Sequence, residues 1–171
     1  GTMGNMAIDQ ARQSWLTDYD EINKAQSILD SRTKGQDLLL TAQQKLSDEG
    51  ALWSTSDEND KKMQNALFAV RGAAALEGND LGYVQNGLLP MIGRTRDIPT
   101  DAVGLLEAAT RSTDVKRSQF AYGVLAAMED VAPEAFTHRV PDRLAANVQY
   151  WRDRKDVMKP EDLDTALKGG M

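Results

Sequence analysis

The chain has no cysteine and a single histidine, His138, among its 171 residues. Zinc sites built on thiolates, iron–sulfur clusters, disulfide frameworks and thiol nucleophiles therefore lack the groups they require. A carboxylate-bridged di-iron site in a helical bundle needs two Glu-x-x-His pairs, so one histidine excludes that centre as well. We expect this protein to contain no metal and to need no cofactor.

Long apolar runs and a net positive charge are also missing. No stretch of 18 or more consecutive apolar residues occurs, so we expect no segment that spans a membrane. The formal net charge is −6, whereas a general nucleic-acid binder presents a basic surface, so we do not expect nucleic acid to be the partner. Because the sequence contains no signal peptide, the cytoplasm is the default expected location.

What the sequence does contain is apolar residues at helical spacing, without the alternation that is typical of strands. This pattern predicts an all-α fold, a compact bundle-like domain of seven to nine helices. The first helix is expected to be long, over about residues 7–32. Residues 7–171 are expected to form the domain, either alone or as a fragment of a longer protein. Residues 1–6 are interpreted as a disordered N-terminus that includes a cloning remnant.

Capping residues and prolines predict where several later helices begin. Thr55 and Glu58 have the spacing of a capping box, and Pro141 and Pro160 suit the first turn of a helix. Two apolar helix faces are expected to be buried against one another, because neither would be stable alone. These faces are Met63, Leu67, Val70 and Ala74 on one helix, and Phe120, Val124, Ala127 and Val131 on another.

His138 and three carboxylates, Glu107, Glu129 and Asp130, are the groups that would serve an enzyme. Glu134 precedes His138 by four residues, a spacing at which its carboxylate would orient the imidazole as a general base. Hydrolases that work with carboxylates alone need two of them at a defined separation, and the sequence supplies no such partner for Glu107. A small hydrolase using carboxylates or His138 is therefore the alternative function.

The segment between Gly78 and Pro99 carries the candidate binding site. Its glycines and prolines are too frequent for one long helix, yet it contains large apolar side chains followed by arginines. An apolar patch rimmed by arginines is typical of partner-binding surfaces, whereas the alternative interpretation is a short helix buried in the bundle. The candidate partner-binding residues are Leu88, Leu89, Met91, Ile92, Arg94 and Arg96.

The favoured function is a non-enzymatic helical module, either a structural protein or one that binds another macromolecule. This hypothesis depends on the lack of a phosphate-binding loop, a metal-ligand set and a nucleophile arrangement in the sequence. The partner would be another protein or further copies of this chain. A virion component and a bacterial effector are examples of such modules, although no motif identifies either.

Overall fold

The computed structural model describes residues 25–26 and 34–169. Every regular element in these residues is a helix and none is a strand, which confirms the predicted all-α class. Internal contacts divide the chain into one unit of residues 1–40 and another of residues 41–171. The expectation of one domain over residues 7–171 stays a prediction.

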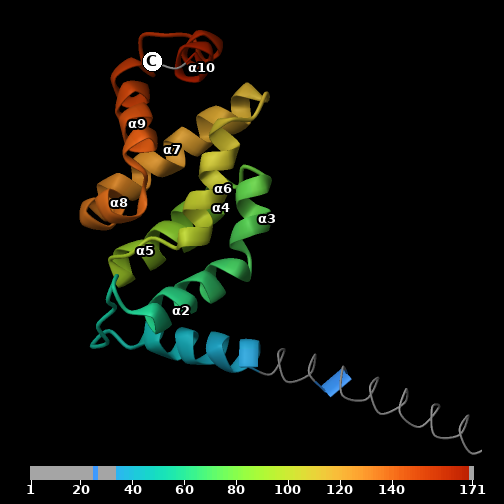
Figure 1. Cartoon of the computed structure of the whole chain (residues 1–171), viewed down its shortest axis with the longest axis vertical. Helices are drawn as coiled ribbons and strands as arrows, with labels where there is room; N and C mark the ends of the chain where they lie inside the picture. Colours follow the sequence, from blue (N-terminus) through green and yellow to red (C-terminus); the bar gives the residue numbers. More distant parts are fainter. Residues whose placement is uncertain (1–24, 27–33, 170–171) are drawn as a thin grey trace, which may run out of the picture. The chain divides into compact units, whose positions relative to one another are not determined.

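The expected long helix over residues 7–32 lies outside the described residues except for 25 and 26, which are helical. The first continuous helix spans residues 34–47 and is drawn in blue in Figure 1. The boundary between the two units falls within this helix, after Leu40.

Short connections join the other helices of the second unit (Figure 1). None of the described helices combines the length and apolar character that a membrane crossing requires. In chain order these helices are α2 (Glu58–Ala69), α3 (Gly72–Glu77), α4 (Leu81–Tyr83), the π-helix η1 (Val84–Leu88), α5 (Leu89–Thr95), α6 (Thr100–Thr110), α7 (Val115–Val131), α8 (Pro133–Arg139), α9 (Asp142–Arg154) and α10 (Pro160–Lys168).

Helix α7 is the central element of the second unit, in contact with α5, α6, α8, α9 and α10. It begins after Asp114, whose carboxylate accepts a hydrogen bond from the backbone N–H of Lys116 at 3.1 Å. It ends before Pro133, which has no N–H to continue the helix. Because helices cover α7 on several sides, its buried residues occupy more than one face.

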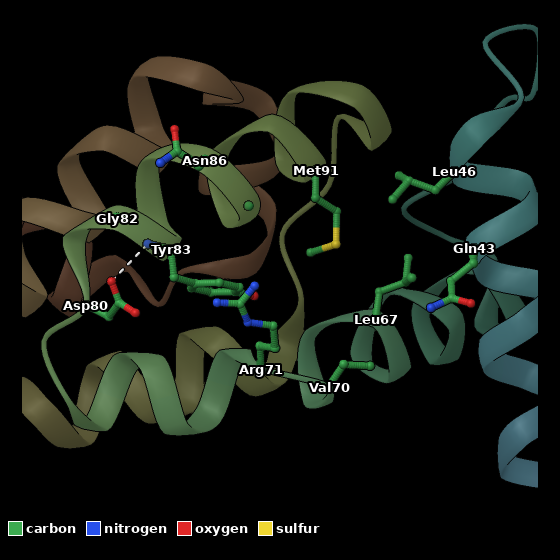
Figure 2. A pocket seen from close by; sticks show the side chains of 11 residues that line it. Gln43, Leu46, Leu67, Val70, Arg71, Asp80, Gly82, Tyr83, Asn86 and Met91 are labelled. Carbon is green, nitrogen blue, oxygen red and sulfur yellow. Dashed lines mark hydrogen bonds between the residues drawn. The ribbon is translucent and has the colours of Figure 1, made fainter.

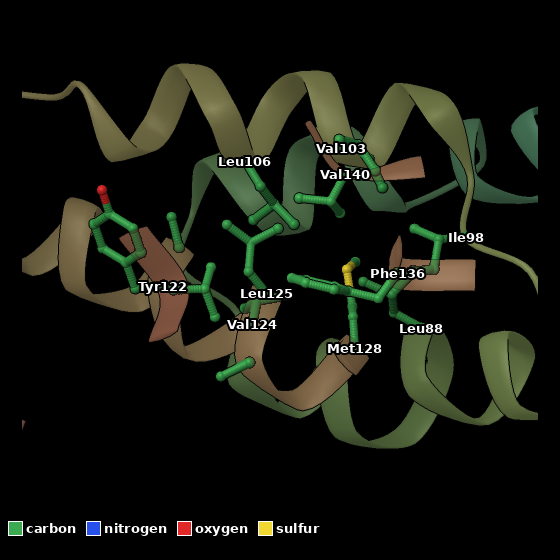
Figure 3. Packing of buried hydrophobic residues seen from close by; sticks show 14 of the residues in the cluster. Leu88, Ile98, Val103, Leu106, Tyr122, Val124, Leu125, Met128, Phe136 and Val140 are labelled. Atoms are coloured by element: carbon green, nitrogen blue, oxygen red, sulfur yellow. The ribbon is translucent and has the colours of Figure 1, made fainter. Parts of the chain in front are cut away.

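One apolar cluster fills the interior between these helices (Figure 3). Leu125 and Met128 of α7 meet Val103 and Leu106 of α6, and Phe136 of α8 lies among them. All five side chains are buried. Burial of each large apolar side chain stabilises the fold by roughly 1.5–3 kcal/mol, so this cluster is a major source of the unit's stability.

The first predicted buried face is only partly correct. Met63 is buried and Leu67 half-buried, but Val70 is 56% exposed and Ala74 is exposed. The chain does not continue as one helix here, because α2 ends at Ala69 and α3 begins only at Gly72. The predicted capping residue is also wrong.

Asp57, not Thr55, caps α2. Its carboxylate accepts hydrogen bonds from the backbone N–H groups of Asn59 at 2.8 Å and Asp60 at 3.0 Å. The Thr55 carbonyl instead accepts a hydrogen bond from Arg139. A cap two residues later shortens the expected helix by about half a turn without changing its position in the chain.

The second predicted face, on α7, coincides only in part with the residues that are buried there. Val124 is buried as expected, but Phe120 and Ala127 are half-buried and Val131 is exposed. The more deeply buried residues include Ala121, Leu125 and Met128. A single-stripe pattern does not describe a helix that other helices surround.

Candidate functional site

The predicted partner-binding segment lies mainly in the core. Leu88 and Ile92 are fully buried, Met91 is 8% exposed, and Leu89 is half-buried. Of the two interpretations of this segment, the burial of these side chains agrees with a short helix packed into the bundle, because η1 and α5 direct them into the apolar cluster. Partner binding by the accessible residues of the segment stays a prediction.

The two arginines of this segment differ in their surroundings. Arg94 is half-buried and donates hydrogen bonds to the backbone carbonyls of Asp48 and Ala51, so it holds α5 against the turn after residue 47. Arg96 is exposed and ends α5 in the left-handed conformation, with a φ of 55°. Arg96 is thus the most accessible of the six candidate residues.

The candidate catalytic groups on α6 and α8 do not lie together in one site. His138 and Glu134 are both exposed near opposite ends of the short helix α8. Glu107 forms an ion pair with Arg111, one turn later on α6, at 3.0 Å. No second carboxylate is paired with Glu107 in the described residues in the way that acid–base hydrolysis requires.

The remaining candidate carboxylates, Glu129 and Asp130, both face Arg152 of α9. The Arg152 guanidinium lies 3.1 Å from the Glu129 carboxylate and 2.8 Å from that of Asp130. It also donates a hydrogen bond to the Ala126 carbonyl, so it joins α9 to the last turns of α7. Within residues 34–169, no three His, Asp or Glu side chains gather closely enough to hold a metal ion.

Asp97 and Arg139 form a buried ion pair that the sequence did not reveal. The Nε and Nη2 atoms of Arg139 each donate to a carboxylate oxygen of Asp97 at 3.0 Å. The side chains are only 10% and 2% exposed, and the Asp97 hydrogen bond raises the pKa of Arg139. This ion pair links the residues that follow α5 to the end of α8, and Asp97 and Arg139 are 42 positions apart in the sequence.

A hollow of about 590 Å³ is the main candidate site of the second unit (Figure 2). Its apolar wall consists of Leu46 from the first continuous helix, Leu67 and Val70 at the end of α2, and Met91 of α5. On the other side lie Arg71, Asp80, Tyr83 and Asn86. Several broken or irregular helices thus meet around one open space.

The π-helix η1 forms part of the polar wall, and such wide turns are frequent at functional sites. A Cβ atom on Gly87 would lie 3.1 Å from the Tyr83 ring, so the glycine lets this ring lie close to the backbone. The Arg71 guanidinium lies 6.0 Å from the ring centroid. Burial raises the pKa of Tyr83, although the Arg71 charge acts in the opposite direction, so the phenol is neutral near pH 7.

A second hollow of about 660 Å³ adjoins the first and shares Val70, Arg71 and Asp80 with it. This hollow also contains Leu81, which is 53% exposed. We call the two hollows together the Val70 groove, with Leu46, Leu67, Val70, Leu81 and Met91 as its large apolar residues. The sequence pattern placed Val70 in the core, so it gave no signal for this groove.

Comparison with protein-family models, curated proteins and solved structures found no match to this chain.

Proposed function

We propose that this protein is a binding module whose Val70 groove receives an apolar segment of a partner protein. The observation that carries the proposal is the exposure of Val70 and Leu81 beside two adjoining hollows. A single exposed apolar residue is normal on a protein surface, but apolar side chains gathered in a concave surface are typical of interaction sites.

The form of the groove favours a peptide segment as its occupant. Two adjoining hollows offer successive positions for apolar side chains, as an amphipathic helix supplies them at i, i+3, i+4 and i+7. Arg71 lines both hollows and forms no ion pair with any described residue. We therefore expect an acidic residue beside the apolar anchors of the partner.

The test compares Val70→Asp with Val157→Asp. Val157 is 79% exposed and lies in neither hollow, so it is a control with the same change of side chain and charge. Because Val70 is also exposed, both variants should keep their stability to within about 1 kcal/mol in urea unfolding. Peptides selected from a library of amphipathic helices with the unmodified protein then serve as the binding probe.

Val70→Asp is expected to weaken binding of the selected peptides at least about tenfold, because it places a charge against their apolar anchors. Val157→Asp is expected to leave the affinity unchanged, and Arg71→Gln to weaken acidic peptides more than neutral ones. Equal binding by the Val70→Asp variant would refute the groove as the site. Failure to select any peptide that binds the unmodified protein would refute the proposed function.

A further inference from the structure

A separate hollow, of about 410 Å³, lies between α6, α7, α9 and α10 and differs in character from the Val70 groove. Its lining includes the polar residues Thr110, Tyr122, Arg143, Asn147 and Lys168. Four helices thus bring polar side chains to one place, within the range of volumes that binding sites for small molecules occupy.

Tyr122 forms the inner wall of this hollow. Its ring lies at one end of the apolar cluster and its hydroxyl group points away from the other labelled core residues (Figure 3). The ring stacks on Trp151, with centroids 6.5 Å apart, which fixes its orientation. Burial raises the pKa of Tyr122, and the nearby negative charge of Asp164 acts in the same direction, whereas hydrogen bonding by Thr110 and Asn147 lowers it. The hydroxyl is therefore a neutral donor near pH 7.

The charges around the hollow leave one cation without a partner. Lys168 pairs with Asp164 at 2.7 Å and donates to the Ser112 carbonyl, where it offsets the negative end of α6. Arg111, the second cation, pairs with Glu107. Arg143 forms no ion pair with any residue that the structure describes.

Three cations against two carboxylates leave one positive charge at this hollow, in a chain whose net charge is −6. An unpaired guanidinium matches the geometry of a carboxylate or phosphate group, with which it forms charge-assisted hydrogen bonds. We propose that this hollow binds a small molecule through a carboxylate or phosphate group, held by Arg143 and by the hydroxyl of Tyr122. The amide of Asn147 supplies a further donor beside the hydroxyl.

The test titrates the intact protein separately with inorganic phosphate and with citrate, and follows amide chemical shifts by nuclear magnetic resonance. Saturable shifts around Arg143, Tyr122 and Asn147 are expected with at least one of these anions. Saturation by phosphate alone or by citrate alone would identify which anionic group the site accepts. Shifts that stay linear with both anions would overturn the proposal.

Two variants and a control locate the anion. Arg143→Gln should weaken binding at least about tenfold, because it removes a charge-assisted contact. Tyr122→Phe keeps the ring that stacks on Trp151 and should weaken binding about threefold to tenfold. Arg96→Gln removes an exposed arginine outside the hollow and should change the affinity less than about twofold.

The variants also distinguish binding of the anion in this hollow from nonspecific binding at the protein surface. A loss of affinity with Arg143→Gln but not with Tyr122→Phe would place the anion on the surface and overturn the proposal. The same would follow from equal losses with Arg143→Gln and Arg96→Gln. Melting temperatures of the Tyr122→Phe and unmodified proteins establish that each titration reports on a folded chain.

Discussion

Two regions of the second unit interrupt their helices in opposite ways. Between α2 and α3 the chain leaves helical geometry at Arg71, and the adjacent Val70 lies exposed in the groove. Between α4 and α5 the chain widens into η1 without a break, and Leu88 and Ile92 remain fully buried. The break between α2 and α3 therefore exposes an apolar residue, whereas the π-helix η1 leaves the apolar residues beside it buried in the core.

The physical causes of the two interruptions differ. A Cβ atom on Gly72 would lie 2.2 Å from the ring of Phe68, so the first break depends on a close approach that only glycine allows. The second interruption, at η1, lies just before Pro90. In a regular α-helix the Pro90 ring would clash with the backbone carbonyl of residue 86. The wide π turn gives this ring room while the helix continues, so the buried face continues as well.

The largest expected effect concerns the ion pair that holds the end of α5. Arg139→Met leaves the Asp97 carboxylate buried without its positively charged partner and with only the backbone N–H of Ile98 as a hydrogen-bond donor, which should lower the free energy of unfolding by roughly 3–5 kcal/mol. Arg111→Met removes the exposed pair with Glu107 and should cost at most about 1 kcal/mol. Urea unfolding measures both, and similar losses would mean that the buried pair is not what fastens this region.

A direct comparison of the two regions uses alanine. Ile92→Ala should cost roughly 2–5 kcal/mol, because it leaves a cavity in a fully buried position. Val70→Ala should change stability by no more than about 0.5 kcal/mol, because Val70 is exposed. Equal costs in urea unfolding would contradict the assignment of one residue to the core and the other to the groove.

The features that the sequence predicted are those set by neighbouring residues. The all-α class follows from apolar spacing, and Pro160 opens α10 while Pro141 immediately precedes α9. Each of these signals acts within one helical turn, so a single sequence is sufficient to find it.

The features that escaped prediction depend on contacts between distant segments. Five helices cover α7, so its buried face cannot be found from its own periodicity. Asp97 and Arg139 meet only because α5 and α8 come together. For the same reason neither candidate hollow was predicted, since helices from several parts of the chain form each wall.

The smallest expected effect tests the cause of the break between α2 and α3. Gly72→Ala should cost about 1–3 kcal/mol, because Phe68 is buried and its ring has little room to move away from an added methyl group. Gly104, within α6, has open space where its Cβ would lie, so Gly104→Ala should stabilise the protein by roughly 0.5–1 kcal/mol. Urea unfolding should therefore give changes of opposite sign for the same substitution. If both variants were more stable than the unmodified protein, contact with Phe68 would not explain why the helix ends before Gly72, and the exposure of Val70 would need another cause.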